Sequence, residues 1–234
     1  MVNKNNIKII SVGGSIIIPK TGFDISFLKK FRQTILDEVK KGQKFILIIG
    51  GGSTARFYQD ALKETIKLKD VDLDWMGIGA TIINANFVRL MFGEFAHKEV
   101  ITNPTKKLKT NKAIIVAAGY KPGCSTDYDA VLLAKTYSVK EMFNLSNIEY
   151  VYDKDPREFT EAKIIEQIDW KTFRKEIVGD VWQPGKSAPF DPVASKLAEK
   201  MKLKVSILQG TNLLEVKKAL SGKKFKGTRI SDMN

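Results

Sequence analysis

Three glycine-rich segments hold the residues of this sequence that are best suited to chemistry. Each follows a short apolar run, and the three are residues 12–15 (VGGS), 50–56 (GGGSTAR) and 119–127 (GYKPGCSTD). Glycine leaves the backbone N–H groups unshielded, and the start of a helix carries a partial positive charge. Because the second and third segments also open predicted helices, they suit the binding of a phosphate group. The sequence therefore predicts a ligand that carries phosphates.

Polar side chains beside these glycines extend the predicted site. Arg56 lies about one helical turn beyond the triple glycine, where its guanidinium could bind the same anion. Ser125 and Thr126 add hydroxyl groups, and Asp127, which follows them, is the acidic residue with the strongest case for a function. The standard nucleotide fingerprints are absent, since no G-x-x-x-x-G-K-[ST] motif occurs and the GIG at 77–79 lacks a third glycine and a preceding strand.

A second group of polar residues follows the apolar run at 142–145. Asn147, Tyr152 and Asp155 lie on one predicted loop and could hold a base and a ribose. Asp74, Asp153 and Asp191 precede predicted helices or lie in loops. Capping and turn formation explain these three acids as well as ligand binding does.

Alternating strands and helices must position these residues. Helices are predicted from the spacing of apolar residues at 28–39 and 75–92, and from the Asp-Pro pair at 191–192 through Met201. Buried strands are predicted from short apolar runs, most of them rich in isoleucine and valine, at 7–12, 45–49, 113–117, 142–145 and 205–208. This alternation predicts an α/β fold with an open, mostly parallel sheet covered on both faces. Ligands of such sheets bind beyond the carboxyl ends of the strands, where the glycine segments occur.

Composition and charge narrow the classes of protein. The chain has 234 residues with one cysteine, one histidine and a net charge of +13. A single cysteine excludes an internal disulfide framework, and His97 alone makes a histidine metal site unexpected, so no fixed metal site is predicted. No targeting or membrane-spanning segment is recognised, and a cytoplasmic location is expected. The charge favours anionic partners, but nucleic-acid binding would rest on charge alone and is not expected.

Taken in order, these segments resemble the amino acid kinase family over nearly the whole chain, and within it the uridylate kinases. The similar segments are GGS at 13–15, GGG at 50–52 with AR at 55–56, DWMGI at 74–78 followed by AT at 80–81 and NA at 84–85, PGCSTD at 122–127, NIEYVYDKDP at 147–156, DPVASK at 191–196 and GT at 227–228.

The resemblance implies transfer of the γ-phosphoryl group of MgATP to UMP. It implies a three-layer α/β/α sandwich in a single domain, with approximate lobes at 1–112 on the acceptor side and 113–234 on the ATP side, and a homo-oligomer, usually a hexamer. The implied catalytic residues are Arg56, Lys186 and Asp127. The implied ATP-binding residues are Gly13, Gly14, Ser15, Gly52, Arg56, Ser146, Asn147, Tyr152 and Asp155. The implied UMP-binding residues are Gly51, Asp74, Tyr120, Lys121, Pro122, Gly123, Cys124, Ser125 and Thr126.

Several positions depart from the family pattern. Ser11 and Ser53 stand where lysine or another charged residue is common, and Ile82 stands where related sequences carry arginine. The cation that stabilises the transition state is therefore open: Lys186 is preferred, with Lys4, Lys8, Lys121 and Lys196 as alternatives. Two other functions remain open, namely an enzyme of the same family with another phosphate or carboxylate acceptor, and a nucleotide-binding protein without catalysis.

Overall fold

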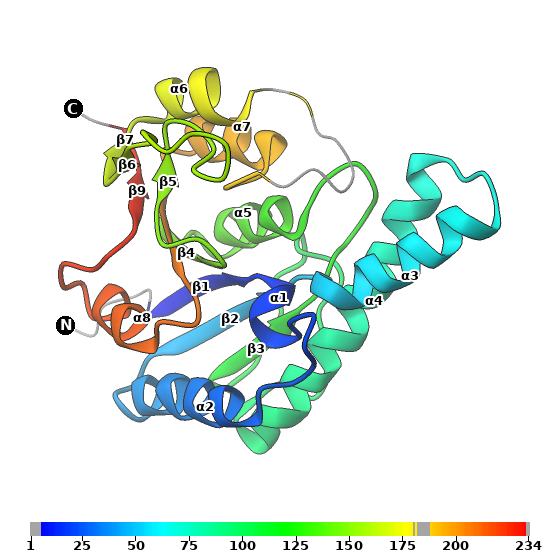
Figure 1. The fold of residues 1–234 in the computed structure, drawn as a ribbon. Helices are drawn as coiled ribbons and strands as arrows, with labels where there is room; N and C mark the ends of the chain where they lie inside the picture. The colour runs from blue at the N-terminus through cyan, green and yellow to red at the C-terminus, as the bar shows by residue number, and fades with distance from the viewer. Residues whose placement is uncertain (1–5, 180, 182–187, 233–234) are drawn as a thin grey trace.

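One seven-stranded sheet runs through the chain (Figure 1). The computed structural model describes residues 6–179, 181 and 188–232, so Lys186 lies outside the described residues. The strand order is β3-β2-β1-β4-β8-β9-β7, and β5 and β6 form a separate pair. The strands are β1 Ile7–Val12, β2 Lys44–Ile49, β3 Ile114–Ala117, β4 Glu141–Ser146, β5 Val151–Tyr152, β6 Ile164–Ile165, β7 Gln167–Ile168, β8 Lys204–Gln209 and β9 Thr228–Ile230.

The five predicted strands are confirmed, and they are neighbours in the sheet. β3, β2, β1, β4 and β8 pair in parallel. In the register, Val12 stands opposite both Ile49 and Leu145, so these strands end at the same level. The segments that follow β1, β2, β3 and β4 therefore lie at one edge of the sheet, as predicted.

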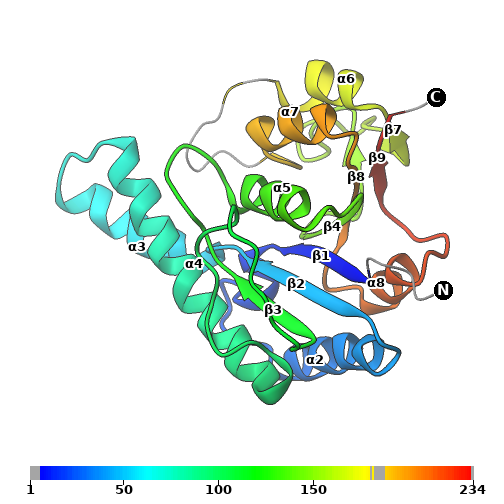
Figure 2. The same cartoon turned by 180° about the vertical axis from the view of Figure 1, so that it is seen from behind.

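Alternate residues of each strand face opposite layers of helices. On β2, Phe45, Leu47 and Ile49 belong to one core and Ile46 and Ile48 to the other. The first core includes α1, α2, α4 and α8, and the second includes α5, α7 and the Trp170–Val178 region. Figures 1 and 2 show the sheet between these two layers. The three-layer α/β/α fold is thus confirmed.

Several helices begin where the sequence supplies a capping side chain. The Asp24 carboxylate accepts a hydrogen bond from the Phe27 N–H at 2.9 Å, and Asp191 caps α7 ahead of Pro192. The helices are α1 Gly14–Ile17, α2 Ile25–Lys40, α3 Gly52–Thr65, α4 Asp70–Phe92, α5 Thr126–Tyr137, α6 Trp170–Thr172, α7 Pro192–Lys200 and α8 Leu213–Leu220. A 3₁₀ turn spans Gly93–Phe95, and a π-helical segment spans Phe173–Val178.

Helix α3 and the start of α4 form an arm that extends away from the sheet (Figure 1). No residue of α3 is buried. The arm nevertheless carries large apolar side chains, including Phe57, Ile66 and Trp75, all exposed.

Some elements differ from expectation. The loop predicted to carry Asn147, Tyr152 and Asp155 is partly a strand, because Val151–Tyr152 form β5 and Val151 is fully buried. β9 adds to the sheet antiparallel to β8, which makes the sheet mixed at that edge. Among the described residues, no helix combines the length and the apolarity required to span a membrane.

Candidate active site

The first two glycine segments are in direct backbone contact. A Cβ atom on Gly14 would lie 2.2 Å from the Gly52 nitrogen and 2.5 Å from the Gly50 oxygen, distances that no side chain can occupy. Gly52 also has φ +56°, a left-handed conformation that favours glycine. Glycine is therefore required at Gly14 and Gly52 because the loops after β1 and β2 touch there.

Free backbone donors gather at this contact. The N–H groups of Gly51, Gly52, Ser53 and Thr54 at the start of α3 have no acceptor within the described part of the chain. Helix starts leave such groups unpaired, and they attract anions. Arg56, one turn further along α3, is exposed, and none of the described residues forms an ion pair with it. The arrangement suits the binding of phosphate oxygens.

The second and third glycine segments meet on α4. A Cβ atom on Gly51 would lie 3.7 Å from the Thr81 side chain, and the Gly119 N–H donates to the Thr81 hydroxyl at 2.9 Å. The Asp74 carboxylate, at the start of α4, accepts from the Gly123 N–H at 2.8 Å. The residues predicted to bind UMP are thereby brought to one place.

The third segment offers fewer free donors than its sequence suggests. Three carboxylates accept its backbone N–H groups: Asp129 from Tyr120 at 3.0 Å, Asp74 from Gly123 at 2.8 Å, and Asp191 from Ser125 at 2.7 Å. These bonds shape the loop from within the protein. Within the described chain, open amides are therefore found at Gly14 and Ser15 and at the start of α3, but not at Gly13, whose N–H donates to the Leu145 carbonyl. For the third segment the expectation of open amides is wrong at Tyr120, Gly123 and Ser125.

Asp127 lies at the base of this edge, half-buried beside β1 and β4. Its carboxylate accepts from the Ser11 hydroxyl at 2.8 Å and from the Asn144 amide at 2.9 Å. Burial raises the pKa of Asp127 to about 7, although both hydrogen bonds act in the opposite direction. Ser11, which departs from the family pattern, is therefore a hydrogen-bond partner of Asp127.

Two neighbours share this buried setting. Burial raises the pKa of Asp129 to about 7, and one of its carboxylate oxygens has no hydrogen-bond partner among the described residues. Burial also raises the pKa of the Cys124 thiol to about 12, so this cysteine is a neutral thiol at physiological pH. A nucleophilic role for Cys124 does not fit this environment.

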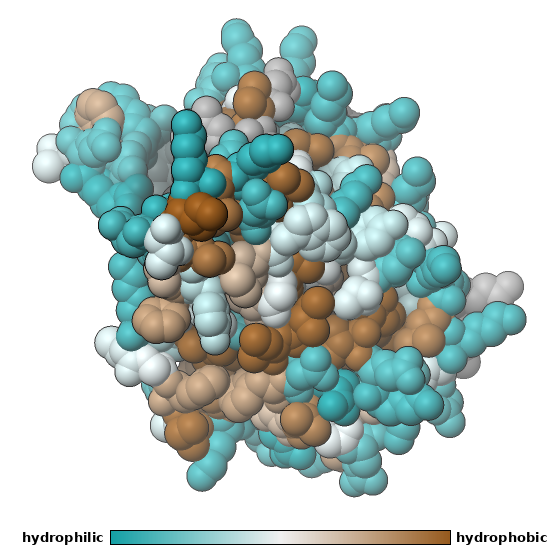
Figure 3. Space-filling view, turned by 90° about the vertical axis from the view of Figure 1, so that its right-hand side faces the viewer, coloured by the Kyte–Doolittle hydropathy of each residue, from teal (hydrophilic) through white to brown (hydrophobic). Residues whose placement is uncertain are grey.

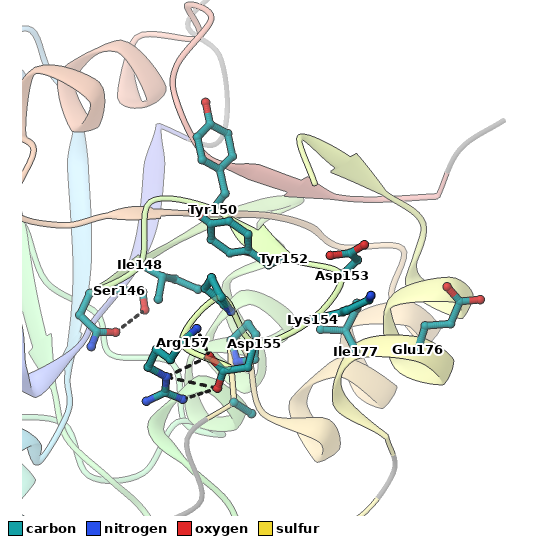
Figure 4. Close-up of a pocket in the computed structure, with 14 residues that line it drawn as sticks. Ser146, Ile148, Tyr150, Tyr152, Asp153, Lys154, Asp155, Arg157, Glu176 and Ile177 are labelled. Atoms are coloured by element: carbon teal, nitrogen blue, oxygen red, sulfur yellow. Dashed lines mark hydrogen bonds and ion pairs between the residues drawn. The ribbon is translucent and has the colours of Figure 1, made fainter. Parts of the chain in front are cut away.

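A cavity of about 490 Å³ opens beyond β4. Its lining includes four residues predicted to bind ATP, namely Ser146, Asn147, Tyr152 and Asp155. Figure 4 shows Tyr150, Tyr152 and Ile148 in the upper part of the view, and Lys154, Ile177 and Glu176 together on the right. Since the Gly13 N–H donates to the Leu145 carbonyl at 2.9 Å, the cavity begins beside the first glycine loop.

Arg157 is a residue of this cavity that sequence reasoning missed. Its guanidinium binds both oxygens of the Asp155 carboxylate, with the Nη2–Oδ2 distance at 2.6 Å (Figure 4). This pairing lowers the pKa of Asp155 to about 2. The signal in the sequence is the Asp155-Pro156-Arg157 triplet, because an arginine two residues after a loop aspartate can turn back and pair with its carboxylate.

The other two departures from the family pattern have structural partners. The Ser53 hydroxyl donates to the Ile18 carbonyl at 2.5 Å, which ties α3 to the segment after α1. Ile82 packs against the core beneath α4. Neither position supplies a cation to the glycine loops.

The amino acid kinase family model matches residues 6–209. The chain belongs to the amino acid kinase family. Among curated relatives, the protein named uridylate kinase from Methanococcus aeolicus is 30% identical over 205 residues, which span 86% of this chain and 90% of that protein. The uridylate kinase of Methanocaldococcus jannaschii is 29% identical over 91% of this chain and 95% of its own length.

Solved structures of this family share the fold. The crystal structure of uridylate kinase from Archaeoglobus fulgidus has a TM-score of 0.79 and 26% identity, and the match covers 96% of this chain and all of that one. The UMP kinase structure from Bacillus anthracis has a TM-score of 0.78 at 20% identity, over 98% of this chain and 97% of that one, and it supports the fold alone.

Proposed function

We propose that this protein is a UMP kinase, which transfers the γ-phosphoryl group of MgATP to UMP and releases UDP and ADP. The single observation that carries the proposal is the backbone contact between Gly14 and Gly52. At this contact, the cavity beyond β4, which suits a nucleoside, adjoins the loop after β3 that Asp74 shapes. Two nucleotides bound on these two sides could therefore meet at their phosphates. The relatives named uridylate kinase support this choice of acceptor.

Each predicted residue has a place in this proposal. The cavity lined by Ser146, Asn147, Tyr152 and Asp155 takes the nucleoside of ATP. The amides of Gly14, Ser15 and Gly52, with Arg56, bind its phosphates, and Gly13, whose own N–H donates to the Leu145 carbonyl, shapes the loop that presents them. The acceptor UMP lies against Gly51, Asp74, Tyr120, Lys121, Pro122, Gly123, Cys124, Ser125 and Thr126.

Phosphoryl transfer requires alignment and neutralisation of charge more than a nucleophilic side chain. The acceptor is already a phosphate oxygen, so Asp127 is not needed as a strong base; we assign it to organising the ends of β1 and β4 beside the reacting phosphates. Arg56 and Lys186 are the proposed cations. Mg²⁺ fits as a companion of ATP, because it prefers phosphate oxygens and water with few protein ligands. Bound there, it would neutralise phosphate charge.

The proposal extends to the assembly and the location. We infer a homo-oligomer, a hexamer by its resemblance to the family, working in the cytoplasm as one domain with the lobes given above. Support for self-association comes from apolar side chains exposed on the arm and along α4. They are Phe57, Tyr58, Ile66, Val71, Trp75, Ile83 and Leu90. Figure 3 shows hydrophobic side chains gathered in a band across this side of the molecule. Single exposed apolar residues are normal on a protein surface, whereas a contiguous band of them indicates an interaction surface.

An assay of ADP release with several acceptors tests the function. UMP is expected to give turnover well above that with CMP, AMP or small phosphorylated and carboxylated acceptors. Preference for another acceptor would replace the substrate but keep the family. Tight UMP binding with no turnover under any MgATP condition would instead favour a nucleotide-binding protein without catalysis.

A further inference from the structure

Asn84 is a fully buried polar residue of α4 that contacts the second glycine loop. Its side-chain amide donates to the Gly50 carbonyl and to the Gly51 carbonyl, both at 2.9 Å. Its own oxygen accepts from the Thr54 hydroxyl at 3.1 Å. All three hydrogen-bonding groups of the side chain thus contact the turn between β2 and α3.

These bonds determine which way the peptide groups of the loop face. The described chain has no cis peptide, and in a trans peptide the C=O and the N–H point in opposite directions. Because Asn84 holds the Gly50 and Gly51 oxygens toward α4, the N–H groups of Gly51 and Gly52 must point away from α4. Neither N–H has an acceptor among the described residues.

We propose that Asn84 is a positioning residue for phosphoryl transfer: it aims the Gly51 and Gly52 amides at the phosphates of the bound nucleotides. Glycines are flexible, so a loop of three of them would otherwise sample many orientations. Fixing the donors before the substrate binds removes the cost of ordering them during the reaction. The Thr54 hydroxyl assists by defining which end of the Asn84 amide faces the carbonyls.

The decisive variant is Asn84→Asp, which keeps the shape of the side chain but replaces its donors with an acceptor. The two carbonyls would then face a carboxyl oxygen, and the loop amides would lose their orientation. We expect kcat to fall by roughly 10²-fold, the usual effect of losing a preorganised donor. We also expect weaker binding of ATP with unchanged binding of adenosine, because only ATP has phosphates for the amides to hold.

A matched control lies two residues away. The Asn86 amide donates to the Ile82 carbonyl within α4 at 3.0 Å and does not touch the loop. Asn86→Asp makes the same chemical change on the same helix and is expected to leave kcat and the ratio of ATP to adenosine affinity unchanged. A folded Asn84→Asp protein with wild-type kcat and a wild-type affinity ratio would overturn the proposal.

Thr54 keeps the test decisive if Asn84→Asp does not fold. Thr54→Val removes the hydroxyl at constant shape and should lower kcat and ATP affinity in the same direction, while Thr54→Ser should restore both. Equal behaviour of the valine and serine variants would overturn the proposal. The kcat measurement rests on the proposed function, whereas the comparison of ATP with adenosine does not. A wild-type chain that makes no UDP would therefore refute UMP kinase activity and leave the binding test of Asn84 intact.

Discussion

Replacing Gly14 with alanine adds one methyl group at the contact between the two glycine loops. The new Cβ would lie 2.2 Å from the Gly52 nitrogen and 2.6 Å from the Gly52 Cα, both backbone atoms that cannot turn aside. Reaching ordinary contact at 3.4 Å requires a separation of about 1 Å between the loops. A displacement of this size in a reacting site costs about 10²-fold in rate. The overpacking itself should lower the free energy of unfolding by about 1–3 kcal/mol.

Coupled ADP release with UMP and MgATP measures the rate, and thermal unfolding measures the stability. Gly79→Ala is the matched control, because a Cβ there would meet only the Met76 methyl group at 3.7 Å, in the middle of α4. This variant should retain activity and gain about 0.5–1 kcal/mol from helix propensity. A Gly14→Ala protein with near-normal kcat and an unchanged melting temperature would refute the contact on which the site is built.

Three further results are expected. In the folded chain the pKa values of Asp127 and Asp129 are about 7, against a pKa of 3.8 for free aspartate. Between about pH 4 and 7 the folded state therefore binds more protons than the unfolded state, so the free energy of unfolding should fall over this range and then level off. In urea unfolding at several pH values, Asp129→Asn should flatten this slope by up to about 1.4 kcal/mol per pH unit, and an unchanged slope would argue against the assignment. Arg157→Ala removes the partner of the Asp155 carboxylate in the cavity and should raise KM for ATP but not for UMP in initial-rate kinetics. Equal changes in the two KM values would contradict the placement of ATP in this cavity. Phe57→Asp, at a side chain that is 74% exposed on the arm, should reduce the molar mass in light scattering, whereas Leu214→Asp on α8, 64% exposed, should not; the same mass for both variants would remove the arm from the interface.

The central sheet could be predicted because its strands are encoded locally. Runs such as 45–49 are continuous large apolar residues, as expected for strands covered on both faces. Parallel strands of this kind end together, so glycines after several strands must share an edge. The positions of the Gly14 and Gly50 loops followed from that rule alone.

The contacts that shape the site are long-range, and local patterns do not reveal them. Asp191 reads as a helix cap, which it is, but it also accepts the Ser125 N–H from 66 residues away. Asp129 is not among the predicted site residues, yet it is buried and accepts a hydrogen bond from the Tyr120 N–H. Asn84 lies in a segment that resembles the family, but the sequence does not show that its side chain contacts the second glycine loop. Each role depends on which loop packs against the helix face, and only the assembled sheet determines that.

Binding of a single molecule with both nucleosides tests the central claim most directly. In an adenosine–uridine pentaphosphate, five phosphates join the two 5′ oxygens, so the compound should fill the β4 cavity, the glycine loops and the Asp74 side together. Calorimetry should show it binding far more tightly than adenosine pentaphosphate, which lacks uridine, with displacement by either ATP or UMP. Equal affinity of the two pentaphosphates, or displacement by ATP alone, would contradict a shared site for the two nucleotides.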